Sequence, residues 1–258
     1  MLLQIRSYLH FLLNSSNRQG VHSPFVYDLL DNCFYDKSNK KWYDDLAKYM
    51  ITLLKNNTQI NIEDFGAGSK KLQQKKRKLS DIAKKAGIKE KRAQLLGRLV
   101  NYFKSENILE IGTSLGIATA SMSLANSNSK IITLEGCKNT AGIAKNSFKK
   151  FNLQNIELIL GNFTDTLPKV LKNTTFDFIF FDGNHQKRPT IDYFEQCLSN
   201  AHNDSIFIFD DIYWSVGMKE AWNFIKEHPK VTISIDTYYW GIIFFRKEQP
   251  KQHFTIRL

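Results

Sequence analysis

The chain has 258 residues, of which 42% are hydrophobic and 13% aromatic, a composition that supplies a large core and excludes general disorder. Its three cysteines, Cys33, Cys137 and Cys197, are far apart and form no C-x-x-C pair. This argues against a disulfide framework or a zinc site and predicts a reducing, cytoplasmic location. The net charge of +11 lies entirely in residues 1–104, with 20 Lys/Arg against 9 Asp/Glu, whereas residues 105–258 hold 16 of each. Such an excess is typical of a surface that binds anions, or only of solvated helices.

Residues 1–104 are predicted to form a basic helical extension or cap. Apolar residues recur at helical spacing in its first part, at Leu2, Ile5, Leu9, Leu12 and Leu13. This pattern predicts an amphipathic helix that packs on the domain or joins two copies into a homodimer. Further helices are expected from Ser23-Pro24 to about residue 33, and over 42–55, 80–86 and 89–103. No stretch is long and apolar enough to span a membrane.

The polar stretch 56–79 is predicted to be a mobile loop. It contains the glycines of Gly66-Ala-Gly68 and then a strongly basic segment, 68–79, whose role the pattern leaves open. We expect the glycine pair to be a surface turn or a lid.

Residues 105–258 are predicted to form an α/β domain in which strands alternate with helices. The strands are expected at 107–111, 130–135, 156–160, 176–182, 205–210, 231–235 and 240–246, with helices near 117–126, 139–151, 165–172, 189–199 and 216–228. Such alternation predicts a doubly wound, mostly parallel sheet of seven strands. The short link between the last two strands predicts an antiparallel hairpin at one edge.

Two glycine-rich loops compete as the site of a nucleotide-like cofactor, and their surroundings decide between them. Such a loop needs an apolar strand before it, a helix after it, and an acidic residue at the end of the next strand for the ribose hydroxyls. The loop from Gly112 to Gly116 meets all three conditions, with Glu135 as the acidic residue. No strand follows Gly68 at the required distance.

Four linked motifs carry a resemblance to a known family: Leu-Glu-Ile-Gly-Thr-Ser-Leu-Gly, Thr-Leu-Glu-Gly, Leu-Gly-Asn-Phe and Phe-Phe-Asp-Gly-Asn-His. Together they resemble class I S-adenosylmethionine-dependent methyltransferases, which have a Rossmann-like fold. Within that class the chain looks closest to the small-molecule O-methyltransferases of the catechol type and to relatives with an Asp-Gly-x-His motif. The resemblance covers roughly residues 105–248.

The resemblance implies S-adenosylmethionine as the cofactor and assigns its contacts. Glu110, Gly112, Thr113 and Ser114 would lie near its methionine part. Glu135 would bind the ribose with Gly136 beside it, and Asn162 and Phe163 would frame the adenine. The loop chemistry agrees, because Gly112 and Gly116 permit close backbone approach and the helix after Gly116 presents N–H groups to a carboxylate.

Acidic residues end two neighbouring strands. Asp182, Asp210 and Asp211 are expected to converge, because ligands of open α/β sheets lie beyond the carboxyl ends of the strands. Three carboxylates repel one another unless a cation is present, and oxygen ligands favour Mg²⁺ or another divalent cation. Alternatively, Asp210 or Asp211 caps the following helix and Asp182 contacts the cofactor.

His185 stands where the catechol-type enzymes carry a catalytic lysine. A histidine titrates near neutrality and can accept a proton from a hydroxyl group as the methyl group arrives. We therefore expect His185 and Asp182 to be the catalytic residues. Because a histidine replaces that lysine, the resemblance supports methyl transfer but does not identify a catechol as the acceptor.

The sequence thus predicts an S-adenosylmethionine-dependent O-methyltransferase acting on a small-molecule acceptor. Two alternatives stay open. One is an RNA methyltransferase that uses the basic N-terminal region, although the sequence contains no RNA-binding module and no nucleic-acid methyltransferase motif. The other is a protein that binds S-adenosylmethionine without catalysis.

Overall fold

The structure is a computed structural model that describes residues 2–63 and 75–258. The chain forms two compact units. Unit 1 consists of two segments, Met1–Asp36 and Leu171–Leu258, and unit 2 is the continuous segment Lys37–Val170. The predicted boundary at residue 104 stays a prediction.

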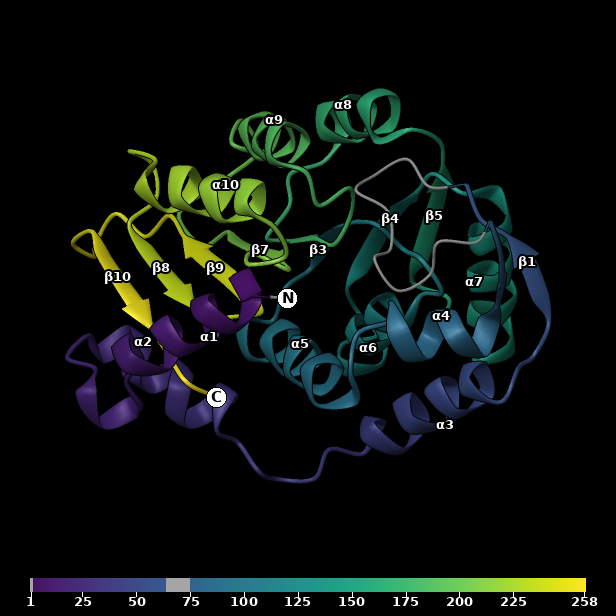
Figure 1. Cartoon of the computed structure of the whole chain (residues 1–258), viewed down its shortest axis with the longest axis horizontal. Coiled ribbons are helices and arrows are strands. Elements are labelled where there is room, and N and C mark those ends of the chain that lie inside the picture. The colour runs from purple at the N-terminus through teal and green to yellow at the C-terminus, as the bar shows by residue number, and fades with distance from the viewer. Residues whose placement is uncertain (1, 64–74) are drawn as a thin grey trace. The chain divides into compact units, whose positions relative to one another are not determined.

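Unit 2 contains a three-stranded parallel part of the main sheet with helices between its strands (Figure 1). Its strands are β3 (Asn107–Ile111), β4 (Lys130–Glu135) and β5 (Ile156–Leu160), in the order β3-β4-β5. The helices are α3 (Trp42–Leu54), α4 (Leu79–Lys85), α5 (Glu90–Phe103), α6 (Ile117–Ala125), α7 (Lys138–Lys150) and α8 (Phe163–Asn173), the last of which continues past residue 170. A separate antiparallel pair joins β1 (Gln59–Asn61) to β2 (Lys76–Lys78).

Unit 1 contains five strands in the order β10-β8-β9-β7-β6. They are β6 (Phe178–Phe181), β7 (Ile206–Asp210), β8 (Ile233–Asp236), β9 (Trp240–Phe244) and β10 (Gln252–Thr255). The helices are α1 (Leu2–Asn14), α2 (Pro24–Leu29), α9 (Lys187–Cys197) and α10 (Val216–Glu227), with a 3-10 turn at Arg18–Gly20 and a π-helical turn at Leu30–Phe34. The purple α1 and the yellow strands, far apart in sequence, belong to the same unit (Figure 1).

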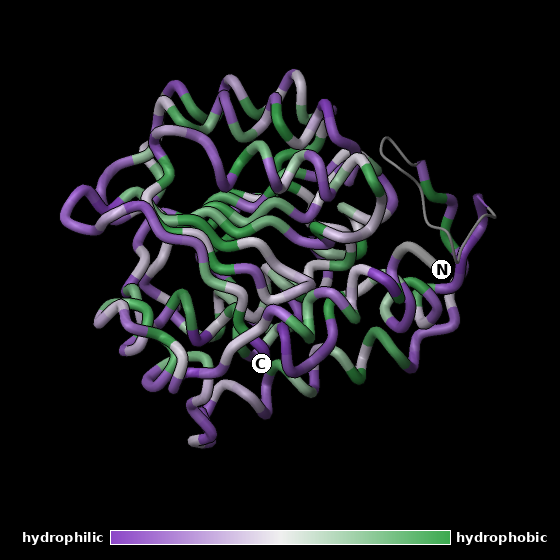
Figure 2. The backbone as a smooth tube through the Cα atoms, turned by 60° about the vertical axis from the view of Figure 1, so that its left-hand side comes forward, coloured by the Kyte–Doolittle hydropathy of each residue, from purple (hydrophilic) through white to green (hydrophobic). Residues whose placement is uncertain are grey.

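Strand β9 is covered on both faces, which explains its unbroken apolar sequence. A Cβ on Gly241 would lie 2.5 Å from the ring of Trp222 in α10, so this glycine leaves room for the indole. On the other face, the ring of Phe244 meets that of Phe25 in α2 edge to face, with the centroids 5.1 Å apart. In Figure 2 the strands are largely hydrophobic, whereas the helices show both hydrophobic and hydrophilic residues and many turns are hydrophilic.

The predicted fold class is confirmed, with one strand more than expected. The main sheet is mostly parallel, and β8 and β9 form the predicted antiparallel hairpin. The predicted count of seven strands is wrong because β10 pairs in parallel with β8, so that the hairpin is not at the edge.

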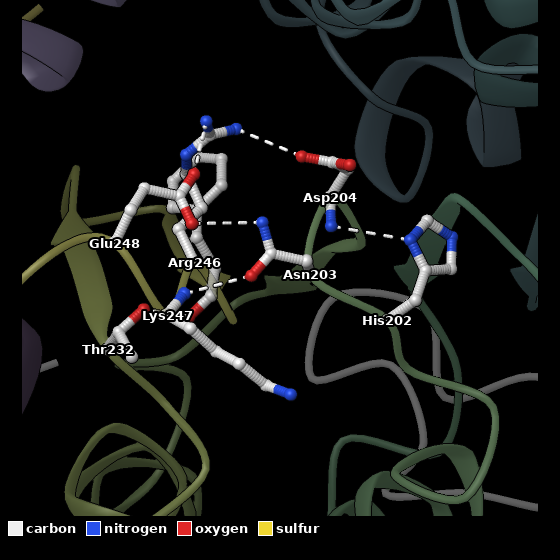
Figure 3. Close-up of polar contacts among 8 residues, drawn as sticks. His202, Asn203, Asp204, Thr232, Arg246, Lys247 and Glu248 are labelled. Atoms are coloured by element: carbon white, nitrogen blue, oxygen red, sulfur yellow. Dashed lines mark hydrogen bonds and ion pairs between the residues drawn. The ribbon is translucent and has the colours of Figure 1, made fainter.

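A polar cluster fixes the turn that leads from β9 to β10 (Figure 3). The guanidinium of Arg246 pairs with Asp204 at 3.2 Å and with Glu248 at 2.5 Å. The side-chain amide of Asn203 donates to Glu248 at 3.0 Å, and its carbonyl accepts the N–H of Lys247 at 2.9 Å. These contacts attach the turn after β9 to the loop before β7, in the same unit.

The helices of the N-terminal region form close to their predicted bounds. Within the expected loop 56–79, β1 and β2 pair as antiparallel strands, so these residues are not a loop. The glycines Gly66 and Gly68 and residues 68–74 of the basic segment lie outside the described residues. None of the helices in 2–63 and 75–258 has the length and apolar character needed to cross a bilayer.

Candidate active site

The loop between β3 and α6 in unit 2 is a tight turn with several left-handed residues. Gly112, Ser114 and Gly116 all have left-handed φ angles, of 111°, 49° and 76°. The N–H groups of Gly112 and Thr113 both donate to the Leu134 carbonyl, at 3.0 and 3.1 Å. The loop is thereby held against the end of β4. Ser114 adopts a conformation that glycine takes more readily, so the backbone is strained at this residue.

Glu135 lies at the end of β4, and its carboxylate is oriented by two backbone donors. One oxygen accepts the N–H of Ser114 at 2.7 Å and the other accepts the N–H of Cys137 at 2.8 Å. Burial raises the pKa of this carboxyl, and the backbone donors offset part of that effect. Each oxygen has lone pairs left, so the carboxylate can also accept hydrogen bonds from two adjacent hydroxyl groups.

Glu110 lies in the core of unit 2, completely buried. Its carboxylate accepts hydrogen bonds from the hydroxyls of Thr133, at 2.6 Å, and Thr119. The Thr133 hydroxyl also lies 2.5 Å from that of Thr113 in the loop. Glu110 is therefore connected to the loop through this hydroxyl network, and its expected contact with the cofactor stays a prediction.

Gly116 is needed for packing as well as for its backbone conformation. A Cβ at this position would lie 2.5 Å from the ring of Phe148 and 2.8 Å from the hydroxyl of Tyr49. That hydroxyl donates to the Leu115 carbonyl at 2.9 Å. The absence of a side chain at Gly116 thus allows the loop to pack against α3 and α7.

The expected adenine residues follow β5. The side chain of Asn162 accepts the N–H of Thr164 at 3.1 Å, and its backbone carbonyl accepts that of Thr166 at 3.0 Å, so this exposed residue caps α8. Phe163 is half-buried in the first turn of α8, and Gly136 follows Glu135 directly.

In unit 1, Asp182 and His185 form an ion pair just after β6. His185 Nε2 lies 3.5 Å from Asp182 Oδ1, and the side chains are 24% and 22% exposed. Burial disfavours the imidazolium, but the Asp182 carboxylate outweighs this and raises the pKa of His185 to about 9. Burial and the charge of Asp210 raise the pKa of Asp182 above its ordinary value, and the contact with His185 offsets part of that effect. The sequence pattern identified both residues but not their direct pairing.

Asp210 is the last residue of β7 and Asp211 follows it, and their charges act on both members of this pair. Asp210 is buried at 8% exposure. Asp211 has a left-handed φ of 53°, and its carbonyl accepts the N–H of Trp214 at 2.8 Å. The donors are of the type that Mg²⁺ prefers. Within 2–63 and 75–258, however, no three acidic, histidine or cysteine side chains are arranged to hold a metal ion.

An aromatic group lies next to these residues in unit 1. The rings of Tyr213 and Tyr238 are stacked, with centroids 5.2 Å apart and an interplanar angle of 15°. The Tyr213 hydroxyl donates to Asp236, a buried residue that the sequence pattern did not single out. Trp240, at the start of β9, is 1% exposed and packs against Phe180 in the core.

Comparison with known proteins gives a consistent result. A family model described as O-methyltransferase matches residues 67–237. A curated catechol O-methyltransferase from Niastella koreensis is 30% identical over 123 residues, which are 46% of this chain and 53% of that protein. The chain thus matches about half the length of this relative.

Solved structures share the fold at low sequence identity. An O-methyltransferase from Bacillus cereus in complex with SAH has a TM-score of 0.56 and 20% identity, covering 86% of this chain and 96% of that one. A SAH-bound methyltransferase from Podospora anserina has a TM-score of 0.61 and 14% identity, covering 88% and 97%. An O-methyltransferase from Streptomyces achromogenes involved in tomaymycin synthesis, in complex with SAM, has a TM-score of 0.58 and 17% identity, covering 81% and 91%.

Proposed function

The chain belongs to the O-methyltransferase family, and from this premise we propose that it transfers the methyl group of S-adenosylmethionine to a hydroxyl group of a small-molecule acceptor. The observation that supports the transfer most directly is the ion pair of Asp182 and His185 after β6. It places a residue that can accept a proton next to a residue that orients it.

Unit 2 is proposed to bind the cofactor. The contacts of Glu135 with two backbone N–H groups hold its carboxylate in one orientation, which suits a ligand with two neighbouring ribose hydroxyls. Gly112, Thr113 and Ser114 would contact the methionine part, with Glu110 acting through the threonine hydroxyls. When bound, S-adenosylmethionine supplies an electrophilic methyl group on a sulfonium centre.

His185 is proposed to be the general base. Its Nε2 faces the Asp182 carboxylate, so Nδ1 is the nitrogen that would accept the hydroxyl proton of the acceptor. Asp182 fixes the ring and stabilises the imidazolium that results, as the carboxylate does in other histidine–carboxylate pairs. The acceptor oxygen would then have the electron pair for the new bond to the methyl carbon, while the electron pair of the broken carbon–sulfur bond would stay on the sulfur of the departing S-adenosylhomocysteine.

A divalent cation is a further part of the proposal, with Asp182, Asp210 and Asp211 as its ligands. The charges of Asp210 and Asp211 both act on Asp182. Such an ion would lower the pKa of an acceptor hydroxyl and orient it. The raised pKa of His185 favours an imidazolium next to Asp182, so a cation bound there would compete with its proton.

The proposal is tested by the formation of S-adenosylhomocysteine with a panel of catechols and simple phenols, together with calorimetric titration of S-adenosylmethionine. His185→Gln is expected to lower kcat by about 10²- to 10⁴-fold with unchanged cofactor affinity. His202→Gln is the matched control, because His202 also pairs with an aspartate, Asp177, at 3.2 Å in the same unit. Equal losses in both variants, or transfer to none of the acceptors, would contradict the proposal.

A further inference from the structure

A single buried carboxylate at the end of β8 holds two different loops. Asp236 is 9% exposed. Its Oδ2 accepts the hydroxyl of Tyr213 at 2.6 Å, from the segment after β7. Its Oδ1 accepts the backbone N–H of Tyr238 at 2.8 Å, from the turn between β8 and β9. Both oxygens are therefore used to join neighbouring loops at the same end of the strands.

Both loops contain a residue in an unfavourable backbone conformation. Asp211 and Tyr238 have φ angles of 53° and 70°, in the left-handed region that favours glycine. Residues with side chains persist in that region only where surrounding contacts determine the conformation. Tyr213 lies two positions after Asp211, in the turn formed by the hydrogen bond from the Trp214 N–H to the Asp211 carbonyl. Tyr238 donates its own backbone N–H to Asp236.

Tyr238 extends the connection to helix α1. Its hydroxyl donates to the Gln4 carbonyl at 2.9 Å. Its ring meets that of Tyr8 edge to face at 4.8 Å and that of Phe11 at 5.6 Å. The same ring is stacked on Tyr213, so α1 is linked to the turn of Asp211 through one aromatic side chain.

We propose that Asp236 is a positioning residue, which with Tyr213 and Tyr238 fixes the turn that carries Asp211 and fastens α1 to it. The expected effect on methyl transfer rests on the proposed function, in which Asp211 is a ligand of the cation that orients the acceptor hydroxyl. Its charge acts on His185, so a displaced Asp211 changes the surroundings of the proposed base. Cofactor binding, assigned to unit 2, is not affected.

The test compares Tyr213→Phe, which removes only the hydroxyl, with Tyr35→Phe. Tyr35 also loses one hydroxyl hydrogen bond in unit 1, to the Arg257 carbonyl at 2.8 Å. Amide hydrogen exchange is measured over α1, residues 211–214 and residues 237–240. Tyr213→Phe should accelerate exchange in all three segments, whereas Tyr35→Phe should leave them unchanged. Acceleration confined to residues 211–214, or equal effects of both variants, would overturn the proposal.

Kinetics provide the second readout. With S-adenosylmethionine and a catechol, Tyr213→Phe is expected to lower kcat/KM for the acceptor roughly tenfold, as for a lost hydrogen bond to a charged group, with unchanged cofactor affinity. Asp236→Asn keeps an acceptor for the Tyr238 N–H and should lose less than Asp236→Ala. An equal loss in the two Asp236 variants would overturn the proposal. If the wild-type protein methylates no acceptor, the proposed function fails, while the exchange data still decide whether Asp236 positions the two loops.

Discussion

His185 Nε2 and Asp182 Oδ1 lie 3.5 Å apart in the segment between β6 and α9, with both side chains mostly withdrawn from solvent. The carboxylate stabilises the imidazolium and raises its pKa to about 9, so His185 carries its proton at neutral pH. A general base must release that proton before it can accept one from a hydroxyl. In the proposed mechanism, the pair therefore determines the fraction of the protein in which His185 is free to accept a proton.

Replacement of Asp182 by Asn should lower the pKa of His185 towards the ordinary histidine value, because the neutral amide no longer stabilises the imidazolium. The charges of Asp210 and Asp211 remain, so the decrease should be partial. Titration of the His185 ring by NMR measures the change. Asp177→Asn, which alters the other aspartate–histidine pair of unit 1, is the control and should leave the His185 pKa unchanged.

The pH dependence of methyl transfer should follow the deprotonation of His185. Because its pKa is raised, the neutral form increases with pH, and kcat/KM should rise about tenfold per pH unit up to a value near 9. A divalent cation held by the carboxylates would compete with the imidazolium proton. Addition of Mg²⁺ should therefore shift the rise to lower pH, and chelation should reverse the shift. An identical profile with and without Mg²⁺ would exclude the cation from the mechanism.

Replacement of Glu135 by Gln should weaken S-adenosylmethionine binding about 10- to 100-fold, the effect expected for lost hydrogen bonds to a charged group. Part of this loss comes from the loop, because an amide cannot accept from both the Ser114 and the Cys137 N–H groups. Calorimetric titration measures the affinity. Glu157→Gln, on the neighbouring strand β5 and exposed, is the matched control. Unchanged affinity in Glu135→Gln would exclude the ribose assignment.

Replacement of Gly116 by Ala should destabilise the protein by about 2 to 4 kcal/mol, combining overpacking with a left-handed residue. The new methyl group would lie 2.5 Å from Phe148, at a φ of 76°. Gly142 in α7 provides the control, since its Cβ would have no neighbour within 4 Å. Gly142→Ala should stabilise the helix by up to about 1 kcal/mol. Urea denaturation measures both, and equal midpoints would show that Gly116 tolerates a side chain.

The alternation of apolar strands with amphipathic helices predicted most of the fold, because burial on both faces leaves a clear pattern in the sequence. Strand β10 leaves no such pattern. Its residues are mainly polar, and it is held by contacts such as that between the His253 ring and the Ser234 hydroxyl, 2.6 Å apart. Strands β1 and β2 are likewise polar and short.

The residues at the strand ends could also be identified from sequence, since topology alone brings them to one edge within a unit. Their individual contacts could not. The sequence around Glu110 has no feature that predicts the burial of its carboxylate against Thr119 and Thr133. The pairing of Tyr213 with Asp236 joins residues from separate strand ends, and the raised pKa of His185 depends on neighbours that only the folded chain provides.

Unit 1 is formed by two segments that are far apart in the sequence, and this affects the order in which its parts can fold during synthesis. Ser16 exchanges backbone hydrogen bonds with the far end of the chain, its N–H donating to the Thr255 carbonyl at 2.9 Å and its carbonyl accepting from Arg257 at 3.0 Å. We therefore expect the first 36 residues to complete their contacts only after the segment Leu171–Leu258 has been synthesised, and the continuous segment Lys37–Val170 to fold earlier. Helix α1, with the exposed side chains of Ile5, Leu9 and Leu13, spends that interval without the ring of Tyr238 to pack against. We expect the apolar surface that is exposed at this stage to favour aggregation of the nascent chain.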